Sequence, residues 1–208
     1  MDLMTALSTP SVWTALGLIM FTNMLLSGDN AVVIAMASRN LAPQHQKRAI
    51  FWGSAAAIIM RILLTIVAVQ LLSLPYLKII GGILLIYIGV QLMAEGDDDE
   101  SIESSSSIFQ AIKTILIADL VMSLDNVVAV AAAAEKAPEE FRMPLILLGL
   151  AMSIPLIIFA STLLLKVMER YPIIITIGAA LLGYLAGEMF VTDPAVTDTL
   201  HSLMDHPN

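Results

Sequence analysis

Apolar residues occur in six long runs, separated by short stretches that hold most of the charged and turn-forming residues. A helix needs roughly 20 apolar residues to cross the hydrocarbon core of a bilayer, and each run is near or above that length. The runs cover residues 11–37, 49–72, 75–93, 108–134, 144–167 and 172–191. The pattern predicts an all-α polytopic membrane protein with about six transmembrane helices.

The composition supports this fold class and narrows the chemistry. Of the 208 residues, 58% are hydrophobic and only 13% are charged, which falls outside the range of soluble globular domains. The chain has no cysteine, so any bound metal ion must be held by oxygen, nitrogen or thioether ligands. We expect a multi-pass protein of the cell membrane, surrounded by the lipid bilayer and with no nucleic acid as a partner.

One acidic, serine-rich segment divides the chain into two halves of three apolar runs each. Such a polar segment cannot pack a core, so it predicts a linker. We therefore expect a first three-helix repeat over residues 1–94, a linker over 95–107, a second three-helix repeat over 108–192 and a polar tail over 193–208.

The two halves resemble each other in sequence. An offset of 96 residues superimposes Asn23 on Asp119, Ser27 on Ser123, Asp29 on Asp125, Asn30 on Asn126 and Gly53 on Gly149. An offset of 97 residues superimposes Pro75 on Pro172, Gly81 on Gly178, Tyr87 on Tyr184 and Gln91 on Glu188. Because three is an odd number, the second unit enters the membrane from the opposite face. The repeats are then inverted, an arrangement in which transporters bind substrate near the midplane.

Each half carries an Asp-Asn pair inside its first apolar run. Ionisable side chains at membrane depth cost roughly 2.5–3.5 kcal/mol each on insertion scales, so two copies in the same register indicate a functional site. Helical spacing places three polar residues of each copy on one inward-facing stripe. The stripes consist of Asn23, Ser27 and Asn30 in the first copy, and of Asp119, Ser123 and Asn126 in the second.

Asp29 and Asp125 lie about 100° around their helices from these stripes, close enough to share the same cavity if the helix is irregular. The Ser27-Gly28 pair offers a place for that irregularity, because glycine gives the backbone freedom to open. The second copy has Leu124 at this position, so a break can be confined to the first copy.

Carboxylate, carboxamide and hydroxyl oxygens are hard ligands that suit Mg²⁺, Ca²⁺ and Mn²⁺ better than Cu⁺ or Zn²⁺. Met122 lies three residues from both Asp119 and Asp125, so its thioether can add a soft contact that favours a transition metal. The alternative is that Asn, Ser and neutral Asp hold the helices together by hydrogen bonds without any ligand. Three Asp residues exceed what that role requires, and the surplus negative charge favours a cation.

Two further charged residues of the apolar runs are candidates for a functional role. Arg61 is the basic residue at membrane depth, and it either forms an ion pair that orients an Asp or acts as a gate or internal counter-cation. Glu188 is either a ligand in a vestibule or a hydrated helix end. Basic residues in the connections set the orientation: six lie on one side of a six-helix arrangement and three on the other, which predicts that both termini are outside.

The motifs SGDNAVVIA, beginning at Ser27, and DLVMSLDNVVAV, beginning at Asp119, resemble the paired motifs of the TerC family of integral membrane proteins. The short six-helix length resembles its YjbE-type metal-transport branch. The resemblance implies manganese efflux and relief of manganese stress, in a family named after a tellurium-resistance gene cluster. The family's motif acids correspond to Asp29, Asp119 and Asp125, with Asn23, Asn30 and Asn126 beside them.

We therefore expect a secondary transporter that exports a divalent metal ion, with Mn²⁺ as the expected substrate, and has no cofactor. Asp29 and Asp125 are the expected main ligands, and Asp119 is a third ligand or a proton carrier. The sequence has no phosphate-binding loop, so ATP hydrolysis is not expected. No His or Cys lies at membrane depth, which argues against an enzyme. A membrane scaffold or tellurium-resistance factor without transport, or a divalent-cation channel, remains open, as does a homo-oligomer.

Overall fold

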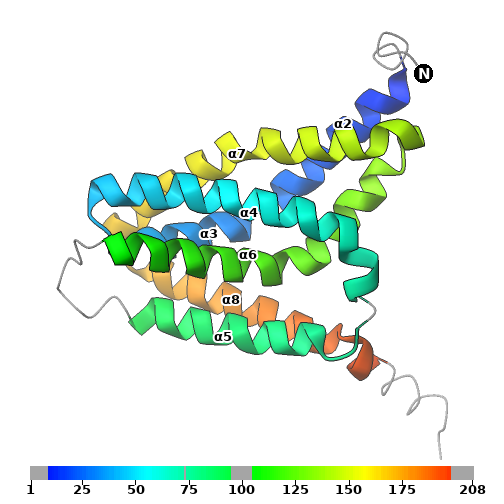
Figure 1. The fold of residues 1–208 in the computed structure, drawn as a ribbon. Coiled ribbons are helices and arrows are strands. Elements are labelled where there is room, and N and C mark those ends of the chain that lie inside the picture. The colour runs from blue at the N-terminus through cyan, green and yellow to red at the C-terminus, as the bar shows by residue number, and fades with distance from the viewer. Residues whose placement is uncertain (1–8, 73, 95–104, 198–208) are drawn as a thin grey trace, which may run out of the picture.

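A computed structural model describes residues 9–72, 74–94 and 105–197, and within these residues every regular element is an α-helix (Figure 1). The helices are α2 (Pro10–Leu25), α3 (Gly28–Ser38), α4 (Pro43–Leu72), α5 (Leu77–Ala94), α6 (Ser105–Ala134), α7 (Glu139–Arg170) and α8 (Ile173–Val191). Most of the predicted linker, residues 95–104, lies outside this description, as do the side chains of residues 67–72, 105, 106 and 125. The remaining linker residues belong to the first turn of α6.

Five of these helices, α4 to α8, contain segments long and apolar enough to cross a membrane. The pair formed by α2 and α3 meets the same test as a single span that is bent by 44°. The prediction of an all-α protein with about six membrane spans is therefore confirmed. The start of α2 and the end of α8 lie at the same end of the molecule, on the right in Figure 1, as an even number of crossings requires.

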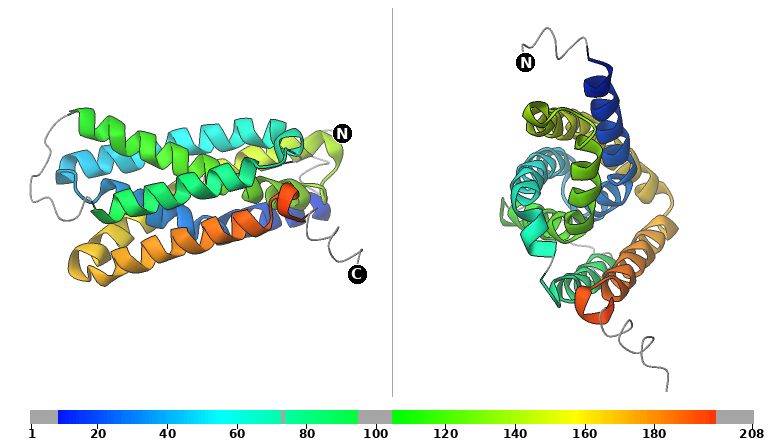
Figure 2. Two further views of the ribbon diagram at one scale, coloured as in Figure 1. Left: turned by 90° about the horizontal axis from the view of Figure 1, so that it is seen from below. Right: turned by 90° about the vertical axis from the view of Figure 1, so that its right-hand side faces the viewer.

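The helices pack in the pairs that two inverted repeats predict. α4 packs against α6, α7 packs against α2 and α3, and α5 packs against α8. The repeat relates α4 to α7, α6 to the pair α2 and α3, and α5 to α8. The contact of α4 with α6 is therefore equivalent to the contact of α7 with α2 and α3. The contact of α5 with α8 is equivalent to itself. Figure 2 shows α5 and α8 side by side along one side of the other helices. We call α2, α3, α4, α6 and α7 the bundle, and α5 with α8 the outer pair.

Two equivalent glycines allow close helix contacts within the bundle. A Cβ atom at Gly53 would lie 2.7 Å from Cδ1 of Ile115, and one at Gly149 would lie 2.5 Å from Cγ2 of Ile19. Residues 53 and 149, and likewise residues 19 and 115, are related by the 96-residue offset. Small residues promote helix association in a membrane because the helix backbones can approach closely. The same contact is therefore used once in each half of the bundle.

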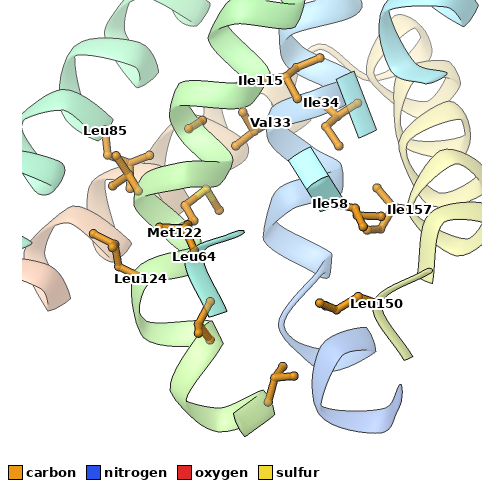
Figure 3. Close-up of a cluster of buried hydrophobic side chains, with 14 of the residues drawn as sticks. Val33, Ile34, Ile58, Leu64, Leu85, Ile115, Met122, Leu124, Leu150 and Ile157 are labelled. Atoms are coloured by element: carbon orange, nitrogen blue, oxygen red, sulfur yellow. The ribbon is translucent and has the colours of Figure 1, made fainter. Parts of the chain in front are cut away.

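Most of the buried side chains between the helices are apolar. Figure 3 shows part of one buried cluster, with side chains from α3, α4, α5, α6 and α7. Ile115 and Leu150 in this cluster are 1% and 0% exposed. Lipid is as apolar as these side chains, so close van der Waals packing, rather than exclusion from water, stabilises their contacts inside the membrane.

The first span is broken at Leu26 and Ser27, where ψ is 1° and −4°. The Ser27 hydroxyl donates a hydrogen bond of 2.5 Å to the backbone carbonyl of Asn23, a contact that bends helices. The break lies at the Ser27-Gly28 pair, where the sequence analysis expected it, but Gly28 does not use the conformational freedom of glycine. Its φ is not in the left-handed region, and a Cβ there would meet nothing within 4 Å. α6 is hydrogen-bonded from Ser105 to Ala134, so the break is confined to the first copy, although the last turns of α6 change direction in Figure 1.

A buried carboxylate joins the two helices of the outer pair. Asp193, just after α8, is 0% exposed and accepts hydrogen bonds from the backbone N–H groups of Tyr76 (2.9 Å), Lys78 (3.1 Å) and Ile79 (3.3 Å). It also accepts one from Ala195 (2.8 Å). Burial raises the pKa of Asp193, but these four donors outweigh burial and hold its pKa below the usual value. Asp193 thus caps the start of α5, a role that its place in the predicted tail did not indicate.

Candidate metal site

A buried network of polar side chains surrounds Arg61 of α4, which is 2% exposed. Its Nη2 atom donates to Asp119 Oδ1 at 2.5 Å, and the two side chains form an ion pair. Its Nε atom donates to Ser123 Oγ at 2.9 Å, and its Nη1 atom donates to Asn23 Oδ1 at 3.0 Å. Ser123 in turn donates to Asp119 Oδ2 at 3.2 Å. The charge of Asp119 is therefore balanced inside the protein.

The network continues to α7 through a residue that the sequence analysis missed. Asn23 Nδ2 donates to Ser153 Oγ at 2.6 Å, and Ser153 donates to the backbone carbonyl of Leu150 at 2.6 Å. The counterpart of Ser153 in the first half is Ala57, so a comparison of the repeats did not select it. We call Asn23, Arg61, Asp119, Ser123 and Ser153 the Arg61 network. It joins α2, α4, α6 and α7.

A separate cavity of about 230 Å³ lies between the bundle and the outer pair. It is lined by Leu26, Asp29, Leu85, Val121, Met122, Asn126, Ala129, Leu185, Glu188 and Met189. Asp29 and Asn126 supply polar groups from the two sequence motifs. Glu188, near the end of α8, also lines the cavity and is exposed. The volume is sufficient for a metal ion together with several water molecules.

The helix break joins the two motifs beside this cavity. The backbone carbonyl of Leu26 accepts hydrogen bonds from Asn30 Nδ2 (3.1 Å) and Asn126 Nδ2 (3.3 Å). The Asp29 carboxylate accepts one from the backbone N–H of Asn30 at 2.7 Å. The Oδ1 atom of Asn30 is buried and has no hydrogen-bond partner among the described residues. The break thus replaces a helical hydrogen bond at Leu26 with two carboxamides, one from each copy of the motif.

The structure therefore separates the predicted site residues into two groups. Asp29, Met122, Asn126 and Glu188 line the cavity. Asn23, Arg61, Asp119 and Ser123 belong to the Arg61 network, and Ser27 bonds to the Asn23 backbone. Asn30 lies beside the cavity but is not part of its lining, and the side chain of Asp125 lies outside the description.

The ligands that the cavity offers are few and mostly oxygen atoms. Among the side chains that the structure describes, no three acidic or histidine residues are placed to hold one metal ion. A cation bound at Asp29 would complete its coordination with carboxamide oxygen and water, which are ligands that divalent cations of this hard type accept. Met189 also lines the cavity and was missed by the sequence analysis, because Met occurs 13 times in the chain.

Spans of this length and a half-buried carboxylate in a cavity between them define a polytopic integral membrane protein with a polar interior site. Residues 8–205 match the family described as "Integral membrane protein TerC family". The chain belongs to this family, so the resemblance inferred from the motifs is confirmed.

Relatives are similar over different shares of the chain. The uncharacterized membrane protein YjbE of Bacillus subtilis strain 168 is 48% identical over 171 residues, which cover 82% of this chain and 76% of YjbE. YceF of the same organism, also an uncharacterized membrane protein, is 22% identical over 88% of this chain and 73% of its own length. The tellurium resistance protein TerC of Serratia marcescens is 34% identical over 85 residues, which cover 39% of this chain and 25% of TerC. No solved structure matches the protein.

Proposed function

We propose that this protein is a secondary transporter that exports a divalent metal ion, Mn²⁺, and binds it in the cavity at Asp29. The observation that carries the proposal is that several described residues of the cavity lining have counterparts in the other half that are buried. Among the described residues, the repeat relates Leu85, Asn126 and Met189 of the lining to Leu182, Asn30 and Leu92, which are 0%, 2% and 1% exposed. A site accessible from one side, with a closed equivalent on the other, is the arrangement that alternating access requires.

The burial of the counterparts supports this comparison. Ala129 and Leu185 are partly exposed in the cavity, whereas their counterparts Val33 and Ile88 are 2% and 3% exposed. The counterpart of Glu188 is Gln91, which is only partly exposed. Because the exposed Glu188 lines the cavity, the cavity reaches the end of the molecule formed by the start of α5 and the end of α8. In the predicted orientation this end faces outside, where an exporter releases its ion.

Glycine contacts indicate which parts change position. Within the outer pair the contacts are symmetric. The repeat relates residue 82 to 179 and residue 89 to 186. A Cβ at Gly82 would lie 3.0 Å from the Ala186 carbonyl oxygen, and one at Gly89 would lie 3.9 Å from the Ala179 carbonyl oxygen.

Between the outer pair and the bundle, the contacts are not symmetric. A Cβ at Gly81 would lie 3.0 Å from Val121 in α6, but one at Gly178 would lie 2.8 Å from Val32 and Met36 in α3. The counterpart of Val121 is Leu25, so repeat symmetry predicts a different contact for Gly178. Two internally symmetric parts in an asymmetric relation support a mechanism in which the outer pair rocks against the bundle.

The charges support a cation as the substrate. Arg61 directs its ion pair to Asp119, so Asp29 contributes negative charge to the cavity. Carboxylate, carboxamide and water oxygens suit Mn²⁺ and other hard divalent ions. An ion gradient or the membrane potential would drive the cycle, and Asp125 is the second main ligand in this proposal.

The test is Mn²⁺ flux into liposomes that contain the purified protein, under a membrane potential or a pH gradient. We expect saturable flux that Asp29→Asn abolishes. Glu169→Gln, which removes an exposed carboxylate at the end of α7, is the matched control and should retain flux. Flux that rises linearly without saturation would indicate a channel. No flux above that of empty liposomes would reject transport and favour a membrane scaffold.

A further inference from the structure

We infer that the thioethers of Met122 and Met189 are metal ligands in this cavity and make it selective for divalent transition and softer ions over Mg²⁺ and Ca²⁺. The inference rests on the proposed function and identifies the class of ion that the site accepts. Thioether sulfur is a soft ligand that binds Mg²⁺ and Ca²⁺ poorly, because these ions require oxygen. A site that combines one carboxylate with two thioethers discriminates against both.

The two sulfur-bearing side chains reach the same cavity from different parts of the protein. Met122 is on α6 of the bundle and is 7% exposed. Figure 3 shows its side chain among the buried apolar residues. Met189 is on α8 of the outer pair and is 5% exposed. Asp29 lines the same cavity from α3. A cation bound to Asp29 would therefore share its cavity with one methionine from the bundle and one from the outer pair.

Gly81 makes space for the Met189 side chain. A Cβ atom at position 81 would lie 2.7 Å from Met189 Cε, a separation that real Cβ atoms do not show. The absence of a side chain at position 81 thus lets the methionine lie against α5 beside the cavity. Met189 is held by packing rather than extended into lipid.

The repeat argues that these methionines do not serve packing alone. The counterpart of Met122 is Leu26, and the counterpart of Met189 is Leu92. The equivalent positions therefore accept leucine, which has a similar volume and no sulfur. The alternative, that both residues are flexible side chains filling gaps in the core, predicts no consequence for metal selectivity when leucine replaces them.

The experiment uses Cd²⁺ as a soft probe and the purified full-length protein. X-ray absorption of bound Cd²⁺ should show sulfur scatterers in the wild type and lose them in the Met122→Leu/Met189→Leu double variant. Met36→Leu is the matched control, because Met36 is 2% exposed, packs against Gly178 and is outside the cavity lining. In liposomes, the preference for Mn²⁺ over Ca²⁺ should fall by about tenfold in the double variant, which corresponds to about 1.4 kcal/mol.

The outcomes separate this inference from the proposed function. Mn²⁺ flux with an oxygen-only Cd²⁺ shell, or with unchanged selectivity in the double variant, overturns the thioether ligands and leaves transport intact. A sulfur-containing Cd²⁺ shell without flux of any ion supports the ligands and rejects transport. If the wild type neither binds Cd²⁺ nor carries Mn²⁺, both proposals are wrong.

Discussion

Replacement of Arg61 by Met should destabilise the protein strongly. The variant removes an ion pair with Asp119 and hydrogen bonds to Ser123 and Asn23, all inside a region where Arg61 is 2% and Asp119 is 5% exposed. Asp119 would be left as a buried carboxylate without its cation. Breaking a buried ion pair in this way costs about 3–5 kcal/mol.

The double variant Arg61→Met/Asp119→Leu should be less destabilised than either single variant. It leaves no unpaired charge, and apolar residues of similar volume often replace a buried ion pair at little cost. Asn23 and Ser123 would still each lose one hydrogen bond from Arg61, at about 1–3 kcal/mol for each group that stays unsatisfied. The comparison therefore isolates the charge pair from the rest of the network.

The assay is thermal unfolding of the purified variants in detergent, followed by loss of the monodisperse peak in size-exclusion chromatography. For a chain of this length, 1 kcal/mol corresponds to about 2–4 °C in the unfolding midpoint, so the single variants should lose roughly 6–20 °C. If the double variant loses as much as the two single variants together, the ion pair does not couple these residues. Loss of less than about 2 °C in both single variants would also refute the reasoning.

Three further predictions concern the outer pair, the closed counterpart and the helix contacts. Asp193→Ala should destabilise the protein by about 1 kcal/mol at neutral pH, as loss of a helix cap does. Because the pKa of Asp193 is lowered in the folded state, its contribution is complete above the usual Asp pKa of about 3.9 and is lost as the pH falls through the lowered folded value. Melting curves of the variant and wild type should therefore converge in acid. The native chain has no cysteine, so an impermeant thiol reagent should label Ala129→Cys from one side and label Val33→Cys at least several-fold more slowly in the absence of metal. Equal labelling would contradict a closed counterpart. Gly149→Ala should lower the unfolding midpoint, because the added methyl overlaps its neighbour, whereas Gly28→Ala has open space and should not. A destabilised Gly28→Ala would show that the break depends on glycine after all.

Much of the fold followed from local features of the sequence. The length of the apolar runs was sufficient to predict about six spans, because the bilayer thickness determines how many helical residues are needed. Helical spacing was sufficient to predict that Asn23, Ser27, Asp119 and Ser123 face inward, and all four are buried. The motifs were sufficient to identify the family. The boundaries of the two repeats and the orientation in the membrane stay predictions.

The division of the site depended on tertiary contacts. From sequence, Arg61 could pair with any of the three motif acids. It pairs with Asp119 because α4 packs against α6, so Asp29 is the described motif acid that lines the cavity. Ser153 and Met189 became visible only when α7 and α8 were placed beside the motif helices.

Sequence alone determined the helices, their approximate number and the duplicated polar positions, because hydrophobicity and helical period act over neighbouring residues. The tertiary structure decided which acid pairs with Arg61, where the first helix breaks and which residues line the cavity. These features depend on contacts between residues far apart in the sequence, such as those of α4 with α6 and of the outer pair with the bundle, which a local pattern does not specify.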